Sequence, residues 1–483
     1  MNRRARRVVA AVAGIACLAA ASILPAGADA KSQLQGEGES WPQPMLERLQ
    51  NNSAPKIAPF AAGYIDVGDD QARTDVADGI ADYASVGSPF SAAQLAAAKH
   101  HGRSIAYVPY AYGAVAIAFS VDVDPQHGGG VVPSMKLTAA TLAKIFSHQI
   151  TIWADPEILG ENNSDAGLSN PKIPGILTVT RLDSSWSTAA LIQYFLSDAA
   201  ARPIWNSYAT LPALASPPDT PLDRWPSDPL SSNIGIISGS KGVIYTMLVL
   251  DPGTGLRVPN AVTHHIAYLA PAWTTKYNAP VVSVQNKAGQ FVAPTSAGVL
   301  QAIEQGGTVD PKTNLITLDF NKITDPAAYP IPMVEYLAVP TTGLSAAKAK
   351  ALSAFVKYTL SDAGQKDVAD TGYTPVSQAT RTAGLKVAAA LDATSSGQGG
   401  TTTTTTTVGS KTGSTTSTTS ATTGTVGGAG DPTGGASDGS SSGSGSGTAL
   451  PFTGGPPPVV VVLAAFVLLV AVIGRRRARR ARV

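Results

Sequence analysis

Apolar runs rich in β-forming residues alternate with helical patterns through most of the chain. The β-rich runs cover residues 113–121, 175–179, 266–269, 281–284 and 333–339. Apolar residues recur at helical spacing in segments 41–49, 137–146, 188–195, 296–303 and 346–360. Strands that alternate with helices predict an α/β fold. A folded part of about 360 residues suits two lobes better than one.

A low-complexity tract follows this folded part. Residues 394–449 consist mainly of Thr, Ser and Gly, with only Lys411, Asp431 and Asp438 charged. Such a tract has almost nothing apolar to bury, so we expect a disordered linker here.

The first 30 residues have the pattern of a secretory signal. Four arginines within residues 3–7 precede an apolar run at 8–24, and Ala28-Asp29-Ala30 offers a cleavage site between small residues. An uncleaved membrane anchor and a lipoprotein attached through Cys17 are the alternatives. The first interpretation predicts a secreted chain with 1–30 removed.

The other end, residues 450–483, has three parts. Leu450-Pro451-Phe452-Thr453-Gly454 precedes an apolar run at 459–473, and an arginine-rich tail follows. This order resembles the sortase sorting signal of Gram-positive bacteria. The resemblance implies cleavage between Thr453 and Gly454, with sortase and peptidoglycan as partners and the cell wall or cell surface as the location. The segment would contact the membrane before sorting; a plain membrane tail anchor is the alternative.

Composition excludes several functions for the part between these ends. Without residues 1–30 and 454–483, acidic side chains outnumber basic ones, which argues against a nucleic-acid partner. Cys17 is the only cysteine, so a processed chain has no disulfide and no thiol chemistry. No Gly-x-Ser-x-Gly or His-Glu-x-x-His motif is present. We therefore expect no enzyme activity, metal or cofactor.

One loop carries the chemistry of an anion site. The predicted strand before it runs into Arg181-Leu182-Asp183-Ser184-Ser185-Trp186-Ser187, and a helix begins near Thr188. Free N–H groups at a helix start attract anions, and an arginine supplies a planar fork for an oxyanion. The alternative is an ordinary Ser/Asp helix cap beside a surface arginine.

The same loop resembles the Arg-x-Asp-Gly-Ser-Gly-Thr loop of the phosphate ABC-transporter substrate-binding proteins. Further segments resemble that family in order, over about residues 35–391. They are Gly36-Glu37-Gly38-Glu39-Ser40-Trp41-Pro42, residues 81–90, 137–153 and 286–295, Tyr329-Pro330-Ile331-Pro332 and Gly372-Tyr373-Thr374-Pro375-Val376.

The resemblance implies a two-lobed, hinge-connected periplasmic-binding-protein fold of type II. One lobe would combine residues 32–112 and 296–391, and the other would cover 113–295. The family captures an oxyanion in the cleft between the lobes, performs no reaction and serves an ABC-type permease.

The resemblance also implies a set of ligand-binding positions. They are Ser40, Trp41, Asp69, Gly87, Arg181, Asp183, Ser185, Trp186 and Ser187. Asp69 stands for a serine that donates to phosphate, Gly87 for an aspartate that accepts the phosphate proton, and Trp186 for a glycine. An aspartate carboxylate at position 69 would repel a dianion unless it is protonated or turned away.

Two functions follow from these observations. The first is binding of phosphate or a related oxyanion for uptake. The second is a structural or adhesive surface protein that uses a degenerate binding fold, which the wall anchor and the three altered positions favour.

Overall fold

The fold is described from a computed structural model. It covers residues 33–124, 130, 132–162, 167–226 and 234–397. The predicted signal, most of the linker and the sorting signal with Thr453 and Gly454 lie outside these ranges. Among the residues covered, no helix is both long and apolar enough to cross a membrane.

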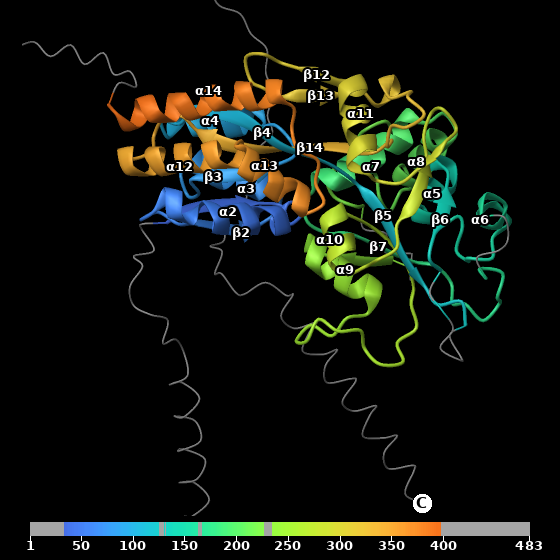
Figure 1. The fold of residues 1–483 in the computed structure, drawn as a ribbon. Helices are drawn as coiled ribbons and strands as arrows, with labels where there is room; N and C mark the ends of the chain where they lie inside the picture. The colour runs from blue at the N-terminus through green and yellow to red at the C-terminus, as the bar shows by residue number, and fades with distance from the viewer. Residues whose placement is uncertain (1–32, 125–129, 131, 163–166, 227–233, 398–483) are drawn as a thin grey trace, which may run out of the picture. The chain divides into compact units, whose positions relative to one another are not determined.

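A five-stranded sheet forms the centre of the first lobe (Figure 1). Its strand order is β2 (Ala62–Asp66), β1 (Leu34–Gly38), β3 (Tyr83–Val86), β14 (Pro332–Pro340) and β4 (Ile105–Ala114). β1 runs parallel to β2 and β3, whereas β14 runs antiparallel to β3 and β4. The helices of this lobe are α2 (Gln43–Ile57), α3 (Asp69–Asp78), α4 (Ala92–His100), α12 (Ala346–Thr359), α13 (Asp362–Asp370) and α14 (Gln378–Ser395). α12 packs against both α2 and α14.

The second lobe is built on a four-stranded sheet. Its order is β5 (Ala116–Val121), β9 (His264–Leu269), β7 (Leu177–Arg181) and β8 (Ile234–Ile237). Its helices are α5 (Ala139–Phe146), α6 (Pro156–Glu161), α7 (Trp186–Ser197), α8 (Ala201–Ala209), α9 (Gly239–Leu248) and α10 (Pro271–Lys276). A small sheet adds β6 (Met135–Leu137), β10 (Val282–Gln285) and β11 (Phe291–Val292). The remaining elements are α11 (Ser296–Gly306), β12 (Gly307–Val309), β13 (Ile316–Leu318) and the 3-10 helix η2 (Phe320–Lys322).

The two-lobed α/β fold is thus confirmed, but one predicted strand is wrong. The run at 113–121 is not continuous, because Val115 separates β4 from β5. Gly113 pairs with Met333 of the first sheet, whereas Ala116 pairs with Leu269 of the second. The chain therefore passes from one sheet to the other at a single residue. The limits of the lobes stay a prediction.

The sequence also failed to indicate most of β4. Pro109 lies inside this strand, and proline usually argues against an interior strand because it lacks an N–H group. Pro109 is accommodated at a β-bulge between β4 and β14. Tyr336 pairs with Pro109 and Glu335 pairs with Ala111, so the register shifts between Glu335 and Tyr336.

Two glycines in β1 leave room for two tyrosine side chains that pack directly against the strand. A Cβ atom on Gly36 would lie 2.2 Å from the Tyr83 ring, and one on Gly38 would lie 2.4 Å from the Tyr64 hydroxyl. Both positions therefore require glycine. The close approach fixes the end of β1, from which Glu39 and Ser40 project toward the second lobe.

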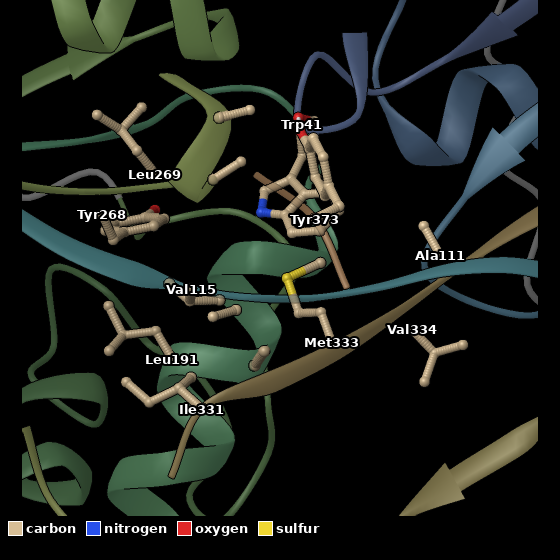
Figure 2. Packing of buried hydrophobic residues seen from close by; sticks show 14 of the residues in the cluster. Trp41, Ala111, Val115, Leu191, Tyr268, Leu269, Ile331, Met333, Val334 and Tyr373 are labelled. Atoms are coloured by element: carbon tan, nitrogen blue, oxygen red, sulfur yellow. Dashed lines mark hydrogen bonds between the residues drawn. The ribbon is translucent and has the colours of Figure 1, made fainter. Parts of the chain in front are cut away.

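The hydrophobic core is continuous across both sheets. Figure 2 shows Trp41 beside Tyr373 and Met333. The rings of Trp41 and Tyr373 meet edge to face at 4.8 Å, and the Tyr373 hydroxyl donates to the Trp41 carbonyl. Gly113 leaves room for this pair, because its Cβ would lie 2.2 Å from the Trp41 ring.

Gly113→Ala is expected to destabilise the fold by about 1–3 kcal/mol, because the added methyl group overpacks the site. Urea unfolding followed by tryptophan fluorescence would measure the change. Gly160→Ala is the matched control, since nothing lies within 4 Å of a Cβ atom at that position in α6. Equal stability of the two variants would contradict this account of the core.

Candidate oxyanion site

Five chain segments meet at the candidate site. Three belong to the five-stranded lobe: Glu39 and Ser40 after β1, Asp69 at the start of α3, and Gly87 in the turn after β3. Two belong to the four-stranded lobe: the loop between β7 and α7, with Arg181 to Ser187, and the start of α9, with Gly239 and Ser240.

Arg181 lies at the centre of this arrangement and is 1% exposed. Its Nε donates to Asp183 Oδ1 at 2.9 Å, and its Nη2 donates to Asp183 Oδ2. Its Nη1 donates to Ser240 Oγ at 2.9 Å. The alternative of a surface arginine therefore does not hold, although Ser185 does cap α7 as predicted.

The carboxylates around Arg181 keep it charged. Burial alone would lower the pKa of Arg181, but Asp183 and, more weakly, Glu39 raise it above its ordinary value. Burial likewise opposes ionisation of Asp183, yet Arg181 outweighs this and lowers the pKa of Asp183. The pair is thus a full ion pair at neutral pH. Asp183 also accepts from Gly239 N–H at 2.9 Å, so it orients the fork and ties the loop to α9.

A pair of serines links the two lobes beside the arginine. Ser40 Oγ donates to Ser240 Oγ at 3.1 Å and accepts from Ser240 N–H at 2.6 Å. Trp273 Nε1 of α10 donates to the Ser40 carbonyl at 3.1 Å.

Ser240 was missed by the sequence reasoning. Its signal was available, because Ser238-Gly239-Ser240 follows the apolar run of β8 as Asp183 to Ser187 follows β7. Gly239 has φ +71° and passes so close to Asp66 that a Cβ atom would lie 3.0 Å from the Asp66 carboxylate. The turn therefore requires glycine, as expected for a backbone that must approach a polar group closely.

The start of α7 is held by its own serines and by a glutamate of the other lobe. Ser185 Oγ accepts from Ser187 N–H at 3.3 Å, and the two hydroxyls lie 2.6 Å apart. Ser185 Oγ also donates to Glu39 Oε2. The hydroxyl that the resemblance assigns to an oxyanion is therefore engaged with a carboxyl group of the protein.

Glu39 was also missed by the sequence reasoning. It lies next to Ser40, at a position that the pattern of this segment leaves unspecified. Its side chain is 0% exposed. Burial raises the pKa of Glu39 to about 8; Asp69 adds to the increase, while Arg181 and Ser185 oppose it. Glu39 is therefore mainly protonated at neutral pH.

The carboxylate of Asp69 is engaged inside the first lobe. It accepts from Gly87 N–H at 2.9 Å and from the Ser88 hydroxyl, and it pairs with Arg73. Burial raises the pKa of Asp69, and Arg73 opposes the increase. These three donors account for both carboxylate oxygens.

Gly87 and Trp186 contact each other across the lobes. A Cβ atom on Gly87 would lie 2.5 Å from Trp186 Cβ and 2.6 Å from Trp186 Cδ1. The three positions at which the chain departs from the family pattern thus form one connected group, Asp69–Gly87–Trp186.

The structure brings eight of the nine predicted ligand positions into this arrangement. Trp41 differs, because its ring is buried in the core against Tyr373 rather than turned to the site. Within the described part of the chain, no group of three or more His, Cys, Asp or Glu side chains is placed to hold a metal.

A cavity of about 270 Å³ lies against this group. Its lining is mostly apolar and comes from both lobes. It includes Gly87, Trp186, Ala190, Leu318, Val334 and Tyr336.

Comparisons with known proteins agree with this architecture. Residues 25–363 match the family described as the PBP superfamily domain. The chain is 25% identical over 299 residues to phosphate-binding protein PstS 3 of Mycobacterium leprae, which covers 61% of this chain and 69% of that protein. It is 26% identical over 270 residues to phosphate-binding protein PstS of Methanocaldococcus jannaschii, covering 53% and 60%. The crystal structure of a phosphate-binding protein from Stenotrophomonas maltophilia superposes with a TM-score of 0.51 at 16% identity, covering 73% of this chain and 93% of that one.

The contact between positions 87 and 186 gives a double-mutant test. Gly87→Asp is expected to destabilise the fold by about 1–3 kcal/mol, because its side chain would collide with Trp186. In the background of Trp186→Gly the cost should largely disappear, since the clash includes the Cβ atom of residue 186. Urea unfolding of the four proteins in the cycle would give a coupling of at least about 1 kcal/mol.

Additive effects at positions 87 and 186 would contradict the contact. The control combines Gly160→Ala with Trp186→Gly. Their effects on the free energy of unfolding should be additive, because nothing lies within 4 Å of a Cβ atom at Gly160.

The buried carboxyl group of Glu39 predicts a pH dependence of stability. Its pKa rises from its ordinary value of 4.5 to about 8 on folding. The unfolded chain therefore loses this proton first, and stability falls as the pH rises from 4.5 to about 8. Glu39→Gln cannot ionise, so it should gain on the order of a few kcal/mol relative to the wild type over this interval.

Urea unfolding at several pH values would measure this gain. The exposed Glu47→Gln is the control and should follow the wild type. A difference between Glu39→Gln and the wild type that stays constant with pH would contradict the prediction.

Proposed function

The chain belongs to the PBP superfamily, and from this premise we propose that it is an extracellular solute-binding protein for phosphate or a related oxyanion. The ligand would bind between the lobes, where Arg181, Ser40, Ser185, Ser187 and Ser240 converge. The protein would capture the anion and release it unchanged, without acting as an enzyme.

The observation that carries this proposal is the buried guanidinium of Arg181. A guanidinium that is 1% exposed is costly to bury unless its charge is paired and its N–H groups are hydrogen-bonded. Asp183 fixes the plane of the fork, while hydroxyl groups of both lobes supply neutral donors beside it. A planar fork with neutral donors and helix starts is an arrangement suited to an oxyanion.

The relatives add independent support. Proteins named as phosphate-binding occur among them in Mycobacterium leprae and in Methanocaldococcus jannaschii. These names favour solute binding over the alternative of a structural or adhesive surface protein.

The altered group Asp69–Gly87–Trp186 bears on selectivity. In the family that the sequence resembles, an aspartate at position 87 accepts the proton of hydrogen phosphate and so disfavours sulfate. Gly87 has no acceptor side chain, and the Asp69 carboxylate is occupied by Arg73, Ser88 and Gly87 itself. We therefore expect weaker discrimination between phosphate and sulfate in this protein.

The location and partners are proposed from the ends of the sequence. The signal at 1–30 would direct secretion, and sortase would join Thr453 to peptidoglycan. The Thr/Ser/Gly tract at 394–449 would then be a flexible tether of roughly 40 Å root-mean-square length. The covalent link would restrict the lobes to this reach from Thr453, so an ABC-type permease would have to lie within it.

Calorimetric titration with phosphate and with sulfate at neutral pH tests the binding function. Arg181→Ala should weaken anion binding at least about 100-fold, because it removes a charged, buried donor. Arg181→Lys keeps a positive charge beside Asp183 and guards against loss of folding; it should still weaken binding, because the ammonium group lacks the planar fork.

Arg202→Ala is the matched control, since Arg202 is exposed and pairs with Asp219 on the surface. Its affinity should equal that of the wild type. Anion affinity that is unchanged in both Arg181 variants would remove Arg181 from the site.

A further inference from the structure

Glu39 is a buried acid without a basic partner of its own. Its backbone carbonyl accepts from the Tyr64 hydroxyl, which fixes the residue at the end of β1. Its Oε2 is bonded to Ser185, but its Oε1 is buried with no hydrogen-bond partner among the described residues. Buried polar atoms in folded proteins are nearly always satisfied, so an orphan oxygen beside an anion site requires an explanation.

The bond from Ser185 to Glu39 conflicts with ligand binding. A serine hydroxyl has one proton to donate. Ser185 donates its hydrogen bond to Glu39. The Ser187 hydroxyl at the same helix start lies 2.6 Å from the Ser185 hydroxyl. An oxyanion that accepts a hydrogen bond from Ser185 must therefore replace Glu39 as the acceptor.

Electrostatics points in the same direction. Arg181 is the positive charge that acts on Glu39, and Arg181 is also the charge that would attract the ligand. A carboxyl group and an oxyanion both offer acceptor oxygens to the Ser185 hydroxyl, and both interact with the charge of Arg181. The two groups thus compete for the Ser185 donor.

We propose that Glu39 is a built-in competitor in the oxyanion site, whose carboxyl group holds Ser185 and must be displaced before an anion binds. This inference rests on the proposed binding function and adds a means of regulating it. Glu39 comes from the first lobe and Ser185 from the second, so the same bond also bridges the lobes.

Protonation of Glu39 then modulates the site. The other ionisable groups that act electrostatically with Glu39 come from α3, β2, β7 and its following loop, β14 and the segment before α14. They are Asp69, Tyr64, Arg181, Asp183, Glu335 and Tyr373. Among them only Arg181 is basic. Since Arg181 is already paired with Asp183, ionisation of Glu39 near pH 8 adds a negative charge to the site, and oxyanion affinity should fall as the pH rises through this value.

The test compares Glu39→Ala, Glu39→Gln and the wild type by calorimetric titration of the secreted protein. Sulfate is the probe at pH 6 and pH 9, because its charge is constant over this interval, and phosphate is the second probe at pH 7. Glu39→Ala removes the competitor altogether, so it should bind either anion at least about tenfold more tightly than the wild type.

Glu39→Gln separates the effect of the negative charge of Glu39 from the effect of the space that its side chain fills. It fills the same space but cannot ionise, so its affinity for sulfate should be nearly equal at pH 6 and pH 9. The wild-type affinity should fall about tenfold over the same interval. If Glu39→Ala does not fold, as judged by circular dichroism, this pH comparison decides the question.

Glu37→Gln is the matched control. Glu37 is a buried glutamate two residues earlier on β1 and interacts with Asp75 instead of the site. It should show the wild-type affinity and the wild-type pH dependence of sulfate binding.

The possible failures are distinguishable. Equal or weaker anion binding by both Glu39 variants, with binding by the wild type intact, would overturn the competitor role and leave the binding function standing. Binding of neither anion by any folded variant would overturn the binding function and this inference together.

Discussion

The buried charge of Arg181 is the constraint on which the arrangement of the site depends. A guanidinium cannot be taken out of water unless its charge and its N–H groups are matched. Asp183 supplies the charge, and its second role as acceptor for Gly239 draws α9 toward β7. Ser240 accepts hydrogen bonds from both Arg181 and Ser40, and so connects the arginine to the other lobe. One desolvated group therefore determines how the ends of three elements meet.

The polar groups of the site are largely satisfied by one another. Ser185 at the start of α7 and Ser240 at the start of α9 donate to Glu39 and Ser40 after β1, and Arg181 of β7 donates to Ser240. The groups that form the contacts between the lobes are therefore groups that a ligand would use. The affinity of such a site is a difference between two sets of hydrogen bonds rather than the sum of one set. Small changes in the internal partners can therefore change the affinity strongly while the ligand contacts remain the same.

The sequence was informative where local chemistry coincided with a change of secondary structure. Arg181 and Asp183 stand where an apolar strand gives way to a serine-rich helix start, and this position predicted an anion site, with a helix cap beside a surface arginine as the alternative. Ser240 stands at a comparable strand-to-helix turn, but its partner Arg181 lies 59 residues away in the chain. Glu39 carries no such local signal of its role, because its partner Ser185 lies 146 residues away. The break at Val115 was also hidden, since pairing with β14 or β9 is decided by tertiary contacts and both halves read as apolar β-structure.

The contact between residues 87 and 186 limits the routes by which this site can have arisen. Because the two Cα positions lie so close that a Cβ at 87 would be 2.5 Å from the Cβ at 186, at least one of the two residues must be glycine. The family pattern places the glycine at the second position, and this chain places it at the first. A lineage that exchanges the two by single substitutions must pass through glycine at both. On this backbone, such an intermediate would lack both side chains at the contact between the lobes.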